Sequence, residues 1–535
     1  MSVPALPLSR GRRWAVTAGI ITGMFLAALE ATVVATAMPT VIAALGGMNH
    51  YSWVFSAYLV ASTVTVPVWG KLSDLHGRRL YYLIGVGVFL AGSILSGVAR
   101  SMPELIVYRT VQGIGAGALI PLGMTIIGEI FTLEERARMQ GMFSGVWGLA
   151  SIVGPLLGGF ITDQLSWRWV FFVNVPFGIA SAVIIGFALR EPAGRERRSI
   201  DYAGAIVLTA AVTILLLALV EGEGGGAALV TPGRIALIGV SLALLVLFVA
   251  IERRAAEPIV PPALFANRVV SVSVVVGFLA GIGMFGAITY VPLFAQGARG
   301  ATATEAGSLL TPLMLSWVTM SVVGGRLLLR LGYRPMVLTG LSFLTAGFAV
   351  FWSFGRETPR AFLLADLALI GAGLGLTMLT LLLAVQHAVA RSQLGIATSL
   401  NQFFRTIGGA IGVAVMGAAL SIGLESRLGA AARTGGRALS PELAASLAEE
   451  PSALIDPVAR DGVTPEVLEI LQTALAQSLD VVFLLGVVAS LLGLLVALFW
   501  LPRTVEREAV SYAEGERMVM AEMTTLNPKN EPAGD

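Results

Sequence analysis

The chain has 535 residues, of which 56% are hydrophobic and 13% charged, and its formal net charge is only +2. Uncharged apolar runs of about 20 residues, the length of helix that crosses a bilayer, recur from one end to the other. This composition excludes a soluble globular protein, and the small net charge excludes a nucleic-acid-binding surface. The chain has no cysteine, which excludes disulfides, thiolate metal sites and cysteine nucleophiles. The three histidines are too scattered to form a metal cluster.

The apolar runs predict 14 membrane-spanning helices at about 20 residues per crossing. In chain order they are 14–37, 51–72, 81–99, 103–127, 139–162, 168–189, 202–220, 233–251, 268–294, 305–330, 334–353, 361–384, 397–423 and 479–501. The first run follows three arginines, as the apolar part of a signal peptide does. It is too long for a signal peptide and more spans follow it, so we interpret it as a retained helix. An even number of spans places both ends of the chain on one side.

Lysine and arginine are distributed unevenly over the predicted loops. The N-terminal segment and alternate loops carry about 19 of them, against about 6 in the remaining loops. Because cationic loops resist translocation, this asymmetry predicts that both termini are cytoplasmic.

The two ends of the chain repeat each other. Glycine patterns that begin at Gly70, Gly113 and Gly154 recur at Gly325, Gly371 and Gly408, which are separations of 255, 258 and 254 residues. Three matches at nearly one separation predict two six-helix bundles in the same orientation, with two inserted helices and a substrate pathway between the bundles.

This repeat predicts four segments along the chain. They are a first bundle at 1–190, the two inserted helices with cytoplasmic flanks at 191–262, a second bundle at 263–502 and a cytoplasmic tail at 503–535. An acidic, alanine-rich insertion at 424–478 interrupts the second bundle on the outer side, and Pro441 and Pro465 are plausible helix starts in it. We expect short amphipathic helices over the outer mouth or the headgroup layer, and a disordered loop is the open alternative.

Five short motifs follow one another in the first half of the chain: Leu29–Val34 with Pro39, Gly70–Arg79, Leu105–Gly117, Gly148–Gly159 and Trp167–Pro176. In this order they resemble those of the 14-span drug:proton antiporters of the major facilitator superfamily, the EmrB/QacA type. The resemblance covers nearly all of residues 14–501. It implies an all-α integral membrane protein of the major facilitator fold, located in the bacterial plasma (inner) membrane. It also implies multidrug efflux by alternating access, in which lipophilic, often cationic, small molecules leave in exchange for protons.

The second motif is expected in the loop between the second and third helices. Asp74 can accept hydrogen bonds from a facing helix N-terminus or an arginine, while Arg78 and Arg79 hold the loop at anionic headgroups. The predicted charge lock of the inner gate consists of Gly70, Asp74, Gly77, Arg78 and Arg79. The open alternative is that the arginines only obey the positive-inside rule. Leu329 stands at the repeat position of Asp74, so we expect the lock to be asymmetric.

The fourth motif contains Gly154, Pro155, Gly158 and Gly159. Glycines admit close helix approach and proline removes one backbone hydrogen bond, so this segment is a candidate hinge and seal between the bundles. Simple small-residue packing explains the glycines equally well.

Charged residues inside the spans are costly unless they are paired or wetted, at about 2.5 to 3.5 kcal/mol each. Glu30 and Arg109 lie at similar depth, about 10 Å and about 9 Å from the outer ends of their helices. A nearby arginine favours the ionised form of a glutamate, whereas burial without the arginine favours the protonated form. A change in the distance between Glu30 and Arg109 would therefore switch Glu30 between releasing and binding a proton. The family usually has aspartate where Glu30 stands. The alternative to a proton switch is a static buried pair that serves packing. Asp366, about 8 Å inside its helix, is either a second proton site or a solvated helix-end carboxylate.

Aromatic and thioether side chains near mid-membrane are candidates for an adaptable apolar substrate cavity. They are Met24, Phe25, Trp53, Tyr58, Met284, Phe285, Trp317 and Phe403. For any single one of them, packing or contact with lipid is the stronger interpretation.

An enzyme is not expected, because the sequence has no zinc-protease helix, nucleophile elbow or phosphate-binding loop, and Gly281–Gly286 matches a dinucleotide fingerprint only inside an apolar span. An exporter or flippase of lipids or glycolipids on the same fold remains open, and a membrane scaffold or receptor is a third class. We expect no cofactor other than the proton gradient, no metal and no nucleic acid. The expected partners are a small-molecule substrate, protons and membrane lipids, with a monomeric chain and a periplasmic adaptor only if the source is Gram-negative.

Overall fold

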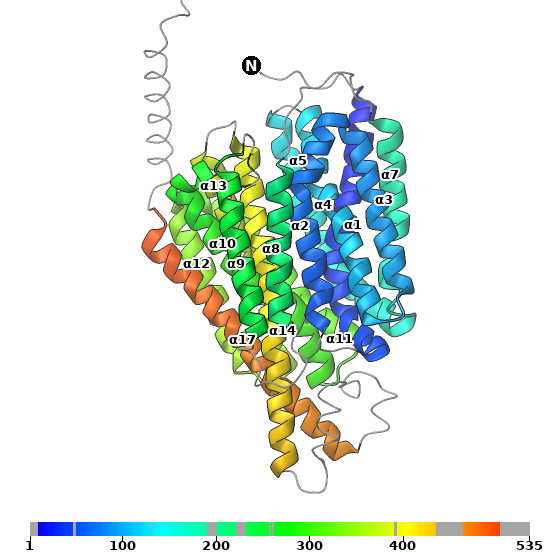
Figure 1. Cartoon of the computed structure of the whole chain (residues 1–535), viewed down its shortest axis with the longest axis vertical. Helices are drawn as coiled ribbons and strands as arrows, with labels where there is room; N and C mark the ends of the chain where they lie inside the picture. Colours follow the sequence, from blue (N-terminus) through cyan, green and yellow to red (C-terminus); the bar gives the residue numbers. More distant parts are fainter. Residues whose placement is uncertain are drawn as a thin grey trace, which may run out of the picture.

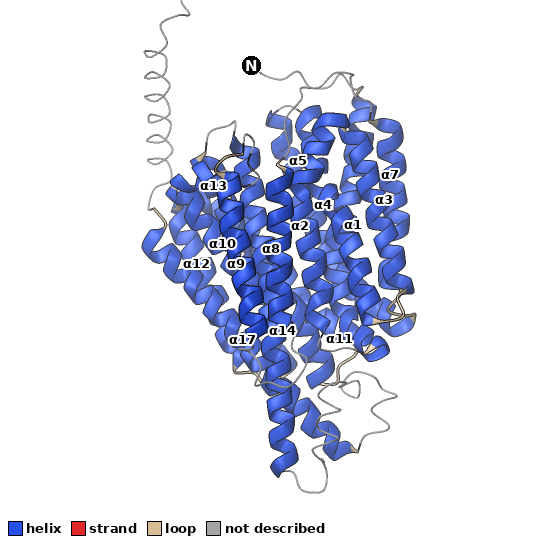
Figure 2. Ribbon diagram, viewed as in Figure 1, coloured by secondary structure: helices blue, strands red, loops and turns tan. Residues whose placement is uncertain are grey.

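The chain is helical throughout the part that the computed structural model describes, and this part contains no strand (Figures 1 and 2). The structure describes residues 9–46, 50–131, 133–189, 201–220, 232–255, 258, 260, 262–389, 393–434 and 464–502. The tail at 503–535 and Pro441 lie outside these residues.

Seven helices form the first bundle and two more connect it to the second. The first bundle has α1 Arg10–Leu45, α2 Tyr51–His76, α3 Arg78–Val98, α4 Met102–Ile130, α5 Leu133–Gln164, the short α6 Trp169–Phe172 and α7 Asn174–Ala188. The connecting helices are α8 Tyr202–Val220 and α9 Pro232–Glu252. The second bundle follows the short η3 Pro262–Ala266 and has α10 Arg268–Leu293, η4 Phe294–Ala298, α11 Ala303–Leu331, α12 Tyr333–Trp352, α13 Arg360–Ala388, α14 Leu394–Thr434 and α17 Pro465–Trp500.

Every predicted span overlaps one of these helices over most of its length, the sixth being shared by α6 and α7. In the described part, 11 helices are long and apolar enough to cross a membrane. Two shorter apolar stretches, Tyr51–Val66 and Ala203–Leu215, lie in α2 and α8. The helical membrane class is thereby confirmed, while the count of 14 crossings stays a prediction.

Local sequence fixes several helix starts. The Ser101 hydroxyl accepts a hydrogen bond from the Glu104 amide at the start of α4, and Thr302 and Glu305 form a reciprocal capping box at the start of α11. At the start of α17 the Thr464 hydroxyl accepts a hydrogen bond from the Val467 amide, and Pro465 lies in the first turn. The predicted helix start at Pro465 is therefore confirmed.

The predicted loop between the second and third helices is wrong, because almost all of Gly70–Arg79 is helical. Helix α2 continues to His76 and α3 begins at Arg78, so that Gly77 alone separates them. Gly77 has a φ of 113°, in the left-handed region that a side chain disfavours. Gly332 has a φ of 82° and separates α11 from α12 in the same way, so the repeat in the sequence is a repeat of this one-residue break.

The expectation of short separate helices in 424–478 is also wrong at both of its ends. Helix α14 continues to Thr434 and α17 already begins at Pro465, and both project beyond the bundle in Figure 1. The reason is hydrophobic: Leu424 and Leu428 on α14, and Leu471 and Leu475 on α17, are all buried in one core cluster. The i, i+4 spacing of each pair puts both leucines on one face, so packing prolongs the two helices past the membrane-spanning part.

The two bundles stand side by side (Figure 1). We call the face at which α1 begins the upper face and the opposite one the lower face, as they stand in Figure 1. Helix α8 packs against α9 and contacts both α2 of the first bundle and α14 of the second. The bundles also meet directly, α5 against α11 and α2 against α14.

Candidate functional site

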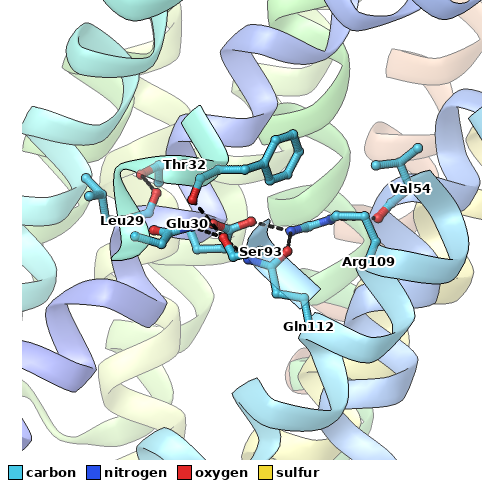
Figure 3. A network of polar contacts seen from close by, with 9 residues as sticks. Leu29, Glu30, Thr32, Val54, Ser93, Arg109 and Gln112 are labelled. Atoms are coloured by element: carbon cyan, nitrogen blue, oxygen red, sulfur yellow. Dashed lines mark hydrogen bonds and ion pairs between the residues drawn. The ribbon is translucent and has the colours of Figure 1, made fainter. Parts of the chain in front are cut away.

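Glu30 of α1 and Arg109 of α4, which were predicted to share a depth, form a buried ion pair inside the first bundle (Figure 3). Arg109 Nη1 donates to Glu30 Oε1, and the two residues are only 2% and 1% exposed. Each charge therefore depends on the other, because neither can be solvated where it lies.

Three uncharged polar side chains complete this network. Gln112, one turn after Arg109 on α4, accepts a second hydrogen bond from Arg109 Nη1 at 2.7 Å and donates to Ser93 Oγ of α3 at 3.2 Å. Asn174, at the start of α7, donates from Nδ2 to Glu30 Oε2 and to Ser93 Oγ, the latter at 2.9 Å. All three are buried, so the network joins α1, α3, α4 and α7 through polar contacts.

Aromatic rings and backbone hold the guanidinium of Arg109 from its other sides. Its Cζ atom lies 4.2 Å from the centroid of the Tyr58 ring and 5.9 Å from that of Phe171, within the range of cation–π attraction. Its Nε donates to the Val54 carbonyl at 3.4 Å. Tyr58, one of the substrate-cavity candidates, thus contacts this network.

Both oxygens of the Glu30 carboxylate have hydrogen-bond donors. Each carboxylate oxygen accepts from a different donor, Arg109 on one side and Asn174 on the other, and hydrogen bonds to the charged form stabilise it. The Glu30 carboxylate thus ties α1 to both α4 and α7.

Sequence reasoning missed Ser93, Gln112 and Asn174. The signal was present, since each is an uncharged polar residue within an apolar span, and Asn174 lies in the motif Trp167–Pro176. Such residues are common in membrane helices, however, and only the packing of four helices shows that these three converge.

Asp366 of α13 lies in the second bundle, and no hydrogen bond between described residues joins it to this network. It is 5% exposed, and neither of its carboxylate oxygens has a hydrogen-bond partner in the described part of the chain. The alternative of a solvated helix-end carboxylate is therefore wrong. A second proton site at Asp366 stays a prediction.

The glycines of the fourth motif lie where α5 meets other helices. A Cβ atom at Gly154 would overlap the Thr32 side chain of α1, and one at Gly158 would lie 2.6 Å from the Val33 carbonyl oxygen. Pro155 and Gly159 face α11 instead. Close packing is therefore present at this motif, and its role as a hinge stays a prediction.

The charge-lock residues lie at the upper ends of α2 and α3, remote from the ion pair. Ser73 Oγ donates to the Gly70 carbonyl at 2.6 Å within α2, Arg78 is half-buried and Arg79 is exposed. The side chain of Asp74 lies outside the described residues, so its predicted contact stays a prediction.

The remaining cavity candidates are spread over helices of both bundles, and the substrate cavity stays a prediction. Met24 and Met284 are buried in separate core clusters, and the rings of Phe25 and Phe177 pack edge to face at 5.5 Å within the first bundle. A cavity of about 470 Å³ between α2 and α8 is lined by none of the eight candidates. The other four candidates are half-buried: Trp53, Phe285, Trp317 and Phe403.

Among the described residues, no three histidine, aspartate or glutamate side chains are placed to hold a metal ion.

Residues 20–413 match the family model of the Major Facilitator Superfamily. The chain belongs to this superfamily. It is 36% identical over 541 residues to the multidrug transporter protein MdtP of Bacillus subtilis, covering 96% of this chain and 97% of that protein. It is 34% identical over 487 residues to multidrug resistance protein 3 of the same organism, covering 90% of this chain and 94% of the relative. The protein is therefore a multi-pass membrane protein of a transporter family.

A solved structure supports the fold. An inward-facing, occupied bacterial homologue of the human lysosomal transporter Spinster matches with a TM-score of 0.63 and 16% identity, over 92% of this chain and 98% of that one. The predicted fold class, two helical bundles of the major facilitator type with two inserted helices, is thus confirmed.

Proposed function

We propose that this protein is a proton-driven exporter of lipophilic, often cationic, small molecules, with Glu30 as the principal proton carrier and Arg109 as its electrostatic modulator. The observation that carries the proposal is the buried ion pair between these residues, with Asn174 on the second carboxylate oxygen. The names of the two Bacillus subtilis relatives support a drug as the exported substrate. Membrane insertion of two charges is costly, so a purely structural role would be served at lower cost by apolar packing.

In this mechanism, protonation of Glu30 removes the charge that Arg109 and Asn174 stabilise. The ion pair then no longer holds α1 against α4, and the bundle can rearrange. Proton binding when the pathway faces outward and release when it faces inward would drive substrate in the opposite direction. A lipophilic cation suits this exchange, because it can compete with the proton for the same carboxylate.

The test uses purified protein in liposomes with an imposed pH gradient. Glu30→Gln mimics the protonated carboxyl group, so we expect it to lose uphill transport of a lipophilic cation while retaining downhill exchange. Glu30→Asp should keep part of the coupling, because it retains the acid. The matched control is Glu104→Gln in the exposed first turn of α4, which should behave as the parent protein.

A Glu30→Gln variant that concentrates the cation as well as the parent protein refutes the assignment. Asp366→Asn is the next variant to test in that case, since Asp366 is the buried acid without a hydrogen-bond partner in the described chain. Fluorescent phospholipid and a lipophilic cation should be assayed in parallel, because transport of the lipid alone would favour the lipid exporter.

A further inference from the structure

The lower ends of α5 and α11 are joined by one carboxylate. Asp163, in the last turn of α5, accepts hydrogen bonds from the Ala303 amide at 3.1 Å and the Thr304 amide at 2.8 Å, and from the Thr304 hydroxyl at 2.5 Å. Ala303 and Thr304 are the first two residues of α11. A side chain of the first bundle thus caps a helix of the second, where helix dipole and free amides both favour a negative charge.

The capping by Asp163 is separate from the capping that α11 provides for itself. Thr302 and Glu305 satisfy each other's backbone amides through the capping box. In the described part of the chain, the amides of Ala303 and Thr304 donate to the Asp163 carboxylate. Loss of Glu305 would therefore weaken α11 itself, whereas loss of Asp163 would weaken the contact between the bundles.

The backbones come into direct contact beside this carboxylate. A Cβ atom at Gly159 would lie 2.6 Å from the Ala303 carbonyl oxygen, and one at Gly307 would overlap the carbonyl of Pro155. No side chain lies between the two backbones at these points. Opening at the lower face therefore requires α5 and α11 to move apart as whole helices, because no side chain there can rotate out of the way.

A second polar bridge crosses between the bundles nearby. Gln296 of η4 donates from Nε2 to the Thr36 carbonyl at 2.9 Å and accepts from the Thr40 hydroxyl at 3.4 Å. Thr36 and Thr40 belong to α1, the helix of Glu30, and Thr36 lies about 9 Å along the helix from Glu30. The contact between the bundles at the lower face therefore includes α1, the helix that carries Glu30.

We propose that Asp163 is a latch residue that favours the conformation closed at the lower face by capping α11 from the opposite bundle. The proposal rests on the proposed export by alternating access, and it assigns the side chain that sets the balance between the two conformations. Asp163 is exposed to solvent, so water can replace its hydrogen bonds when the bundles separate. The latch therefore biases the equilibrium and still allows it to reverse.

The test exploits the absence of cysteine from the chain, which makes single-cysteine labelling free of background. Ala306 is fully buried on α11, one turn beyond the residues that Asp163 caps, so Ala306→Cys reports on opening at the lower face. A membrane-impermeant maleimide is applied from the lower, predicted outer, side. Asp163→Ala should raise the labelling rate by about 5- to 10-fold, because loss of a charge-assisted contact shifts two populations by that order. Asp163→Asn, which retains one acceptor oxygen, should give a smaller increase.

The matched control is Glu305→Ala, which removes a carboxylate from the same helix start but one that bonds only within α11. We expect it to leave the labelling rate of Ala306→Cys near that of the parent protein. Equal labelling rates for Asp163→Ala, Asp163→Asn and the parent overturn the proposal, as does an equal increase with Glu305→Ala. Labelling needs no pH gradient, so a failure of the proton assignment at Glu30 leaves this result intact, and the reverse also holds.

Discussion

Asn174 Nδ2 donates a hydrogen bond to Glu30 Oε2, while Arg109 donates to the other carboxylate oxygen, Oε1. The amide is on α7 and the acid on α1, so this bond joins the first and last helices of the first bundle. It gives a neutral residue of α7 a direct contact with the acid of α1.

Asn174→Ala should therefore destabilise the protein, because it leaves a buried carboxylate oxygen without its donor, at a cost of about 1 to 3 kcal/mol. The measurement is thermal unfolding of the purified protein in detergent. Asn401→Ala is the matched control, since Asn401 donates only a longer bond, 3.3 Å, to the Ser273 carbonyl. A larger effect at Asn401 than at Asn174 would contradict the importance of the bond to Glu30.

The ion pair should show strong coupling in a double-mutant comparison. Arg109→Gln alone leaves the charge of Glu30 buried and without its counter-ion, which costs about 3 to 5 kcal/mol in comparable pairs. The double variant Glu30→Gln with Arg109→Gln removes both charges, so it should unfold at a higher temperature than Arg109→Gln alone. If the double variant is the less stable of the two, the pair is not the electrostatic unit described here.

Close packing of the fourth motif can be tested with one methyl group. Gly158→Ala should destabilise the protein by about 1 to 3 kcal/mol, because its Cβ would collide with the backbone of α1 at Val33. Gly87→Ala on α3 is the control, since no atom lies within 4 Å of its Cβ position. That change should be neutral or stabilise the helix by up to about 1 kcal/mol. Equal stability of the two variants would speak against tight packing of α5 on α1.

Only the middle of the insertion at 424–478 should be dispensable for transport. Deletion of 436–463 with a short linker leaves α14 and α17 whole, so pH-driven export should persist in liposomes. Deletion of all of 424–478 removes buried leucines of the core cluster, and each such loss costs about 2 to 5 kcal/mol. We expect this longer deletion to fail to give a monodisperse protein on size-exclusion chromatography. Complete loss of export in a folded shorter deletion would show that the segment is needed for coupling.

The arginines at the upper end of α3 should affect gating and not substrate choice. Replacing Arg78 and Arg79 with alanine should lower transport of every substrate by a similar factor, about 5- to 10-fold. The reason is their distance from the ion pair, which lies deep within the bundle while they stand at its upper face. Transport assays with several unrelated cations provide the check, and a loss confined to one of them would count against a gating role.

The sequence by itself determined the helices, their order, the repeat and the two charged residues that pair. A helix in a membrane satisfies its own backbone hydrogen bonds, so the length of an apolar run is enough to predict it from the sequence. A charged residue inside such a helix is costly, so its presence marks a residue with a partner or a function. Only the tertiary structure decided which neutral side chains surround Glu30, that α14 and α17 continue past the predicted membrane boundary, and that Asp163 caps a helix of the other bundle. These features depend on contacts between helices distant in the chain, and a polar or apolar residue has the same local signature whatever it meets across the bundle.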